Sequence, residues 1–180
     1  MRPHRPYTLE EYNPIWKETF KEVSEKVKSI LGDTAILIEH IGSTSIEGIV
    51  AKPQVDILVV VKDLDFVKTK HEEMVKAGFT HHGRGYVNED DDYFSLNTQE
   101  GKRIASIHIL QEGDTKIDEY RIFRDYLRTH KDERDLYVQV KRDLYSKYKD
   151  SFNDYDNGKH NVITEIRERA RAWHDGLKNT

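Results

Sequence analysis

The sequence has 180 residues, of which 36% are hydrophobic and 34% charged, with a net charge of −4 at pH 7. This length and composition predict one soluble globular domain, and the negative charge excludes the basic footprint that is typical of nucleic-acid-binding proteins. Cysteine is absent, which excludes disulfides and thiolate chemistry, and with no stretch near the roughly 18 apolar residues of a membrane span we expect a cytoplasmic protein.

The first part of the chain predicts helices and strands in alternation. Asn13 and Pro14 precede a segment whose apolar residues recur every three or four positions up to Gly32, so Asn13 is the expected N-cap. Two segments rich in β-branched residues predict strands, the second apolar enough to be buried on both faces. The expected elements are a helix at 14–31, a strand at 35–41, a short helix or turn at 43–49, a strand at 55–61 and a helix at 65–77.

The second part predicts three short strands and then three helices. The strands are separated by the polar runs NEDDD and TQEGK, which are typical of turns in an antiparallel meander. Asp114, Asp132 and Asn161 are the expected helix N-caps. The expected elements are strands at 84–87, 92–97 and 103–110, helices at 114–130, 131–149 and 161–173, and a polar turn at 151–160.

The order of these elements predicts an α+β fold with a mixed sheet of about 4–5 strands and flanking helices. We expect a single domain over residues 1–180. Its core would lie at about 13–112 and a helical C-terminal part at about 114–176.

The segment GSTSIEGIVAKPQVD, residues 42–56, has the features of a phosphate-binding turn. A strand that ends in Gly42 and Ser43 and turns into a helix presents free backbone N–H groups, which with the Ser43 hydroxyl can hold phosphate oxygens. Thr44 and Ser45 add hydroxyls, and Lys52 is a cation within reach. The structural alternative is that Ser43 is only an N-cap and Gly42 a turn residue.

Asp56 opens the apolar strand that follows. At the rim of the sheet, beside such a turn, its carboxylate could bind a divalent cation. The alternative is a salt bridge between Asp56 and Lys52.

Nine histidines are scattered along the chain without the spacing of a zinc motif, so a dedicated zinc site is not expected. His81 and His82 are expected on the surface. His108 is a candidate ligand because strand alternation places it on the face opposite Ile107 and Ile109, although a structural role fits equally well.

Two charged groups have competing interpretations. The NEDDD run at 88–92 lacks the spacing of a calcium loop and predicts a solvated turn. Arg121, Arg124 and Arg128 fall on one side of a helix and could clamp phosphates, with Arg124 the strongest candidate, or they could pair with Asp118 and Asp125.

The motifs EHIGSTSIEG and AKPQVDILV resemble the signature of the GrpB family, also catalogued as the UPF0157 family of uncharacterised proteins. The resemblance extends over essentially the whole chain and includes FRDYLRTH at 123–130, Lys141 and Lys159. It implies a nucleotidyltransferase fold, in which a Gly-Ser turn holds a nucleoside triphosphate and carboxylates hold Mg²⁺ or Mn²⁺. Gly42 and Ser43 match that turn, and Asp56 matches one carboxylate and is the catalytic candidate.

The chain departs from the family of folds at the second carboxylate. The second carboxylate is expected two residues from Asp56, but the residues at these positions are Leu58 and Gln54. His108 is found at the position of a third acid. Glu39 or His40 could supplement the metal site. Two hypotheses follow: a nucleotidyltransferase-like enzyme with a degenerate metal site and an unknown acceptor, or an inactive module that binds a nucleotide or another phosphorylated small molecule.

Overall fold

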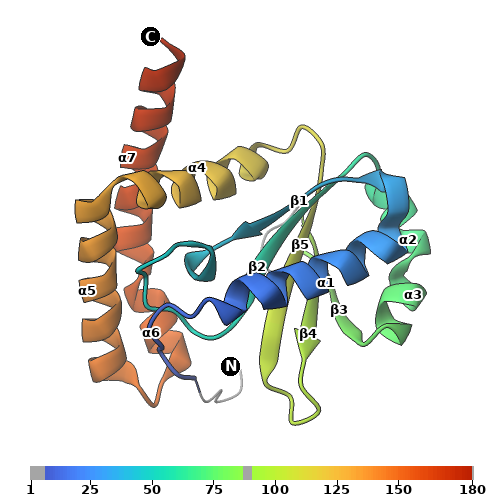
Figure 1. The fold of residues 1–180 in the computed structure, drawn as a ribbon, viewed down its shortest axis with the longest axis horizontal. Coiled ribbons are helices and arrows are strands. Elements are labelled where there is room, and N and C mark those ends of the chain that lie inside the picture. Colours follow the sequence, from blue (N-terminus) through green and yellow to red (C-terminus); the bar gives the residue numbers. More distant parts are fainter. Residues whose placement is uncertain (1–6, 87–90, 180) are drawn as a thin grey trace.

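The computed structural model describes residues 7–86 and 91–179 and contains a five-stranded mixed sheet with helices against both faces (Figure 1). The strand order is β1-β2-β5-β4-β3; β2 and β5 are parallel and all other neighbours are antiparallel. The expected α+β fold and its mixed sheet are therefore confirmed. The strands are β1 (Ala35–Ile41), β2 (Val55–Val61), β3 (Phe79–Arg84), β4 (Asp92–Asn97) and β5 (Arg103–Gln111).

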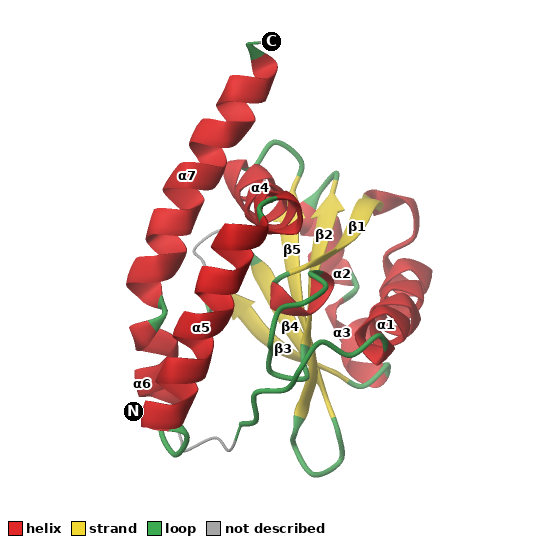
Figure 2. Ribbon diagram, turned by 60° about the vertical axis from the view of Figure 1, so that its left-hand side comes forward, coloured by secondary structure: helices red, strands yellow, loops and turns green. Residues whose placement is uncertain are grey.

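The helices flank the sheet and then continue as a C-terminal group (Figure 2). There are also two short 3₁₀ turns. The first joins α1 to β1, and the second follows β1. The helices are α1 (Ile15–Leu31), α2 (Leu64–Thr69), α3 (His71–Lys76), α4 (Thr115–Thr129), α5 (Lys131–Tyr148), α6 (Phe152–Gly158) and α7 (His160–Lys178), and the 3₁₀ turns are η1 (Gly32–Thr34) and η2 (Ser43–Ser45).

The helix starts confirm some expected caps and correct others. Asp114 Oδ1 accepts from the Lys116 N–H at 2.8 Å, as expected. The N-cap of α1 is Pro14 and not Asn13, although Asn13 Oδ1 accepts from the Ile15 N–H at 3.0 Å. Asp132 and Asn161 are not N-caps, because α5 and α7 each begin one residue earlier than these two positions. Asp132 instead lies in the first turn of α5, where its negative charge is favourable to the helix dipole.

Three expected elements are wrong. The helix at 65–77 is two helices that meet at Lys70, and the first is capped by Asp63. The strand expected at 84–87 lies at Phe79–Arg84, because buried Phe79 pairs with Leu96 of β4; position 87 is outside the described residues. The expected polar turn at 151–160 contains α6, whose Tyr155 is buried.

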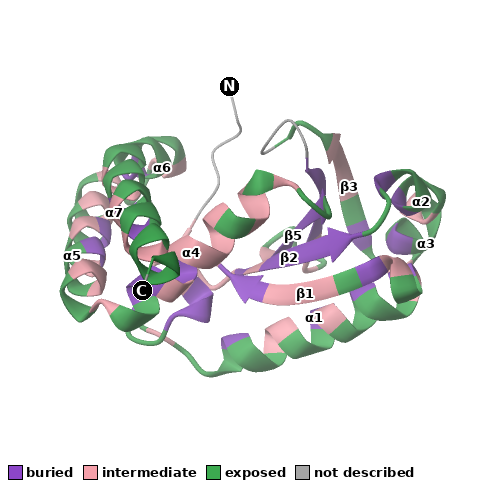
Figure 3. Cartoon of the chain, turned by 90° about the horizontal axis from the view of Figure 1, so that it is seen from above, coloured by how far each residue is buried: buried purple, intermediate pink, exposed green. Residues whose placement is uncertain are grey.

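Three apolar clusters connect these elements. Figure 3 shows how buried and exposed residues are distributed over the helices and strands. The largest cluster lies between one face of the sheet and α1, α2 and α3. The other face of the sheet packs on α4 through Leu58, Val60 and Leu110. The third cluster joins α4, α5 and α7 to Ile46 and Ile49, which follow η2. The segment after β1 is thus held between the sheet and the C-terminal helices. Among the described residues no helix is long and apolar enough to cross a bilayer.

Candidate functional site

The Gly42 turn lies directly against Asp56. Gly42 has φ 68° and ψ −175°, a backbone conformation that is essentially restricted to glycine. A Cβ at this position would overlap Asp56 Oδ2 and would lie 3.1 Å from Asp56 Cγ. The backbone angles and the contact with Asp56 both require glycine at this position. Because glycine has no side chain, the carboxylate can approach the turn.

The Ser43 hydroxyl is joined to a buried lysine from α5. Lys141 Nζ donates to Ser43 Oγ at 2.7 Å and to the Val50 carbonyl oxygen at 2.7 Å, and only 3% of the lysine is exposed. Burial lowers the pKa of Lys141 well below its ordinary value, and the nearby charges of Lys159 and Lys52 act in the same direction. An anion bound beside Ser43 would restore the charge of this amine.

Thr44 and Ser45 stabilise the turn from within. Thr44 Oγ1 and His40 Nε2 are hydrogen-bonded at 2.9 Å, and Ser45 Oγ donates to the Gly42 carbonyl oxygen at 2.6 Å. Both residues are buried. Their expected role in phosphate binding stays a prediction, but in this structure their hydroxyls shape the turn.

A pocket of about 260 Å³ opens over the turn, between the ends of the strands and helices α4 to α7; we call it the Gly42 pocket. Its lining mixes cations with carboxylates that have their own partners. Glu119 pairs with Arg171 at 3.0 Å and Asp156 with Lys159 at 3.0 Å. The charged residues that line the pocket are Lys52, Asp56, Glu119, Lys141, Asp156, Lys159 and Arg167.

Lys159 is the second buried lysine of the Gly42 pocket. Burial lowers its pKa, but the neighbouring Tyr137 and Asp156 outweigh burial and hold the pKa above its ordinary value. Lys159 therefore carries a charge at neutral pH, close to the buried amine of Lys141. The pocket is suited to an anionic ligand.

Asp56 has no carboxylate beside it on the sheet. Its direct neighbours on β1 and β5 are Ile41 and Ser106, and Ser106 Oγ accepts from Tyr93 Oη at 2.8 Å and from Gln54 Nε2 at 3.3 Å. A two-ion centre requires several oxygen ligands around each cation. The strand neighbours Ile41 and Ser106 do not supply such a ligand set.

Of the expected metal ligands, Asp56 and His108 lie on the same face of neighbouring strands, whereas Glu39 and His40, offered as alternatives, have other partners. His108 is opposite Leu58, two residues along the strand from Asp56, and its Nδ1 is hydrogen-bonded to Asp91 Oδ2 at 2.9 Å. Glu39 Oε2 accepts from Arg124 Nη1 at 2.6 Å. His40 lies on the other face of the sheet and stacks on the Phe20 ring.

The environment of His40 is unfavourable for a charged imidazole. Burial and, to a smaller extent, Arg128 and Arg124 lower the pKa of His40 to about 4. The imidazole is neutral at physiological pH and serves the turn through its hydrogen bond to Thr44.

The arginines of α4 attach this helix to the sheet and the turn. Arg124 is 7% exposed and donates to Glu39, Asp125 and the His40 carbonyl oxygen. Arg128 donates to the Ser45 carbonyl oxygen at 2.8 Å. The expected pairing with Asp125 is found for Arg124 and Arg128, whereas Arg121 pairs with Glu39. Phosphate binding by Arg124 would require these bonds to be exchanged.

The solvated turn expected for NEDDD is wrong for its last two residues. Asp91 and Asp92 are 0% and 3% exposed. The first three residues of the run, 88–90, lie outside the described residues. His82, expected on the surface, is partly buried and hydrogen-bonded to Ser95 at 2.8 Å.

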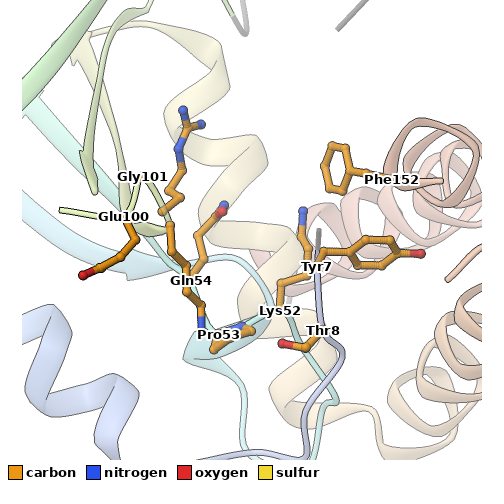
Figure 4. A pocket seen from close by; sticks show the side chains of 10 residues that line it. Tyr7, Thr8, Lys52, Pro53, Gln54, Glu100, Gly101 and Phe152 are labelled. Atoms are coloured by element: carbon orange, nitrogen blue, oxygen red, sulfur yellow. The ribbon is translucent and has the colours of Figure 1, made fainter. Parts of the chain in front are cut away.

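A second pocket, of about 380 Å³, adjoins the Gly42 pocket and shares Lys52 and Gln54 with it (Figure 4). Its wall is aromatic and basic: Lys52 Nζ lies 4.1 Å from the centre of the Phe152 ring, and Tyr7 and Arg103 also line it. We call it the Phe152 pocket. The two pockets together could hold a ligand larger than a triphosphate.

Lys141, Lys159 and Arg167 were not assigned to the site by sequence reasoning. The signal for Lys141 was its position four residues after Tyr137, which places a lysine on the buried stripe of a helix. A lysine on such a stripe must find polar partners, and these are Ser43 and Val50.

The five-stranded mixed sheet with its flanking helices is a nucleotidyltransferase-like fold. A similar fold occurs in the crystal structure of the Cid1 poly(U) polymerase with MgGTP bound, with a TM-score of 0.54 at 11% identity over 77% of this chain and 45% of that chain. At this identity the likeness concerns the fold alone.

The sequence pattern described as GrpB protein matches residues 6–169, and the chain belongs to this family. The UPF0157 protein YqkA of Bacillus subtilis is 35% identical over 177 residues, which are 98% of this chain and 51% of that protein. The chain thus spans about half the length of this relative. The crystal structure of the conserved protein GrpB from Enterococcus faecalis has a TM-score of 0.85 at 31% identity, over 92% of this chain and 99% of that chain.

Proposed function

We propose that the protein binds the phosphates of a nucleoside triphosphate in the Gly42 pocket. One observation carries this proposal: the Gly42 turn lies against Asp56 so closely that a Cβ would overlap the carboxylate. In the nucleotidyltransferase fold these two features hold the triphosphate and direct the reaction. The ammonium group of Lys159 supplies positive charge, and the buried amine of Lys141 would gain its charge when the polyphosphate binds beside Ser43.

The reaction that fits this arrangement is nucleotidyl transfer to a hydroxyl acceptor. The acceptor oxygen attacks the α-phosphorus, the bond from that phosphorus to the bridging oxygen breaks, and pyrophosphate leaves. Asp56 is the carboxylate available to orient the acceptor hydroxyl and to accept its proton. Lys141 and Lys159 would stabilise the charge on the leaving pyrophosphate. The Phe152 pocket, which shares Lys52 and Gln54, is the space for the acceptor.

The second candidate function is binding without transfer. It is favoured because the direct strand neighbours of Asp56 are Ile41 and Ser106, so the sheet supplies no second carboxylate beside Asp56. A pocket that keeps its cations and lacks the usual carboxylate set would still retain a phosphorylated ligand.

A titration with ATP, GTP, CTP and UTP, each with Mg²⁺ or Mn²⁺, separates the two functions when binding is followed by calorimetry and turnover by pyrophosphate release. If the affinity for a nucleotide falls at least tenfold in a Lys141→Met variant, this supports nucleotide binding in the Gly42 pocket, which both functions require. Exposed Lys147 is on the same helix, and Lys147→Met is the matched control.

Turnover that is lost in an Asp56→Asn variant supports transfer, whereas binding without turnover supports the second candidate. If no nucleotide binds at millimolar concentration, or if both lysine variants bind as the unmodified protein does, nucleotide binding in the Gly42 pocket is refuted. Inorganic phosphate and pyrophosphate in the same titration would then report whether another phosphorylated ligand is held there.

A further inference from the structure

Three side chains that can bind a metal converge on the face of the sheet opposite the Gly42 pocket. Asp92 Oδ2 is 2.6 Å from His71 Nε2, and Asp92 Oδ1 is 2.7 Å from His81 Nε2. One ligand atom from each of the three residues lies within 4.8 Å of the other two. We call this group the His71 cluster.

The cluster is produced by strand alternation at the start of β4. Asp91 and Asp92 are adjacent, so their side chains point to opposite faces of the sheet. Asp91 meets His108 on the face of Asp56, whereas Asp92 lies on the face of Phe94, whose ring is 4.5 Å from that of His81. The His71 cluster therefore belongs to the α3 side of the sheet and is separate from the proposed nucleotide site.

Asp92 is a buried carboxylate without a permanent counter-charge. Its side chain is 4% exposed, and among the described residues its ion-pair partners are the imidazoles of His71 and His81 alone. A buried carboxylate is costly unless it is paired with a charge or bound to a metal. A divalent cation held by the same three side chains would supply a charge that does not depend on a bound proton.

We propose that His71, His81 and Asp92 bind one Zn²⁺ ion. Two imidazole nitrogens and a carboxylate oxygen are donors that Zn²⁺ accepts readily, whereas Mg²⁺ is bound poorly by imidazole. Zinc bonds of about 2.0–2.1 Å in a tetrahedron separate the ligand atoms by roughly 3.3 Å. Each histidine nitrogen must therefore move from its carboxylate oxygen by about 0.6–0.7 Å when the ion replaces the shared proton.

The cluster is accessible to an ion from solvent. The side chains of His71 and His81 are 25% and 28% exposed, while Asp92 is covered beneath them. Three protein ligands leave the fourth position of a tetrahedron for water. Since His71 begins α3 and His81 lies in β3, a bound ion would also tie that helix to the sheet edge.

Zinc binding is tested by titrating the full chain, freed of metal by a chelator, with ZnCl₂ in competition with a chromogenic chelator. We expect one ion per chain with micromolar affinity or better. Asp92→Asn and His81→Gln variants should bind at least tenfold more weakly. The exposed His160 lies outside the cluster, and His160→Gln is the control that removes one imidazole without effect.

Two further measurements keep the test decisive. Circular dichroism checks that the variants are folded, and the visible absorption of bound Co²⁺ reports nitrogen and oxygen donors in low coordination and should be lost in His71→Gln. No stoichiometric binding of Zn²⁺, or equal binding by the Asp92→Asn variant, would overturn the proposal. So would loss of binding in an Asp56→Asn variant, because the ion would then be in the Gly42 pocket.

Discussion

Replacement of Gly42 by alanine is expected to destabilise the protein through two separate effects. The φ of 68° and ψ of −175° are essentially restricted to glycine, and another residue there costs on the order of 1–3 kcal/mol. The new Cβ would also overlap Asp56 Oδ2, and overpacking of this kind costs about 1–3 kcal/mol more. The free energy of unfolding should therefore fall by about 2–6 kcal/mol.

Urea unfolding followed by circular dichroism measures this change, and two further variants separate its parts. Gly176 lies inside α7 with open space around it, so Gly176→Ala should raise the free energy of unfolding by about 0.5–1 kcal/mol. In an Asp56→Ala background the overlap with the carboxylate is gone, and Gly42→Ala should cost less by about 0.5–3 kcal/mol.

The reasoning is refuted if Gly42→Ala unfolds at the same urea concentration as the unmodified protein. It is also refuted in part if the effects of Gly42→Ala and Asp56→Ala simply add. In that case the carboxylate and the turn do not touch in solution, and the observation that carries the proposed function fails with them.

Three other predictions follow from the site. His40 is buried with its pKa lowered to about 4, so stability is fully present above pH 6.5 and is lost as pH falls from 6.5 toward 4. Between pH 7 and pH 5 the free energy of unfolding, measured with urea, should fall by about 2 kcal/mol because of His40. This contribution should be absent in His40→Gln. Arg124→Met should cost about 1.5–3 kcal/mol because it removes the hydrogen bonds of a buried guanidinium to Glu39 and to the His40 carbonyl oxygen, and leaves Glu39 with only the more exposed Arg121. Arg142→Met, which removes an exposed ion pair, should cost less than about 1 kcal/mol. The pKa of Lys141 is lowered in the folded protein, so above neutrality the unfolded chain binds one more proton and the free energy of unfolding rises with pH. In Lys141→Met this rise should be smaller than in the unmodified protein. An unchanged pH dependence would mean that Lys141 is charged in the folded state.

Elements with a strong apolar pattern were predictable from the sequence, and elements defined by a few residues were not. The strands at 35–41 and 55–61 and the long helices follow from periodicity alone. The seven-residue helix α6 was expected as a turn because its segment is mainly polar; it is held by the single buried ring of Tyr155. Such a helix depends on tertiary packing, which local sequence does not report.

The site was predictable only where its residues are close together in the sequence. Gly42, Ser43 and Asp56 lie in one segment and do meet. Lys141 and Lys159 come from helices about 100 residues further on, and their approach depends on how α4 packs across the sheet. His71 and Asp92 converge for a similar reason: the register of β3 and β4, and the order of the strands, bring distant positions together.

The assembly of the sheet has a consequence for synthesis on the ribosome, where the chain emerges from its N-terminus. The strands can pair once Gln111 has emerged, but α4 follows them, so Leu58, Val60 and Leu110 remain uncovered until about residue 129 is available. During that interval the nascent sheet presents an apolar surface to water and to neighbouring chains. Three of the pocket cations, Lys141, Lys159 and Arg167, arrive later still. A ligand can therefore stabilise the finished protein but cannot assist the early part of its folding.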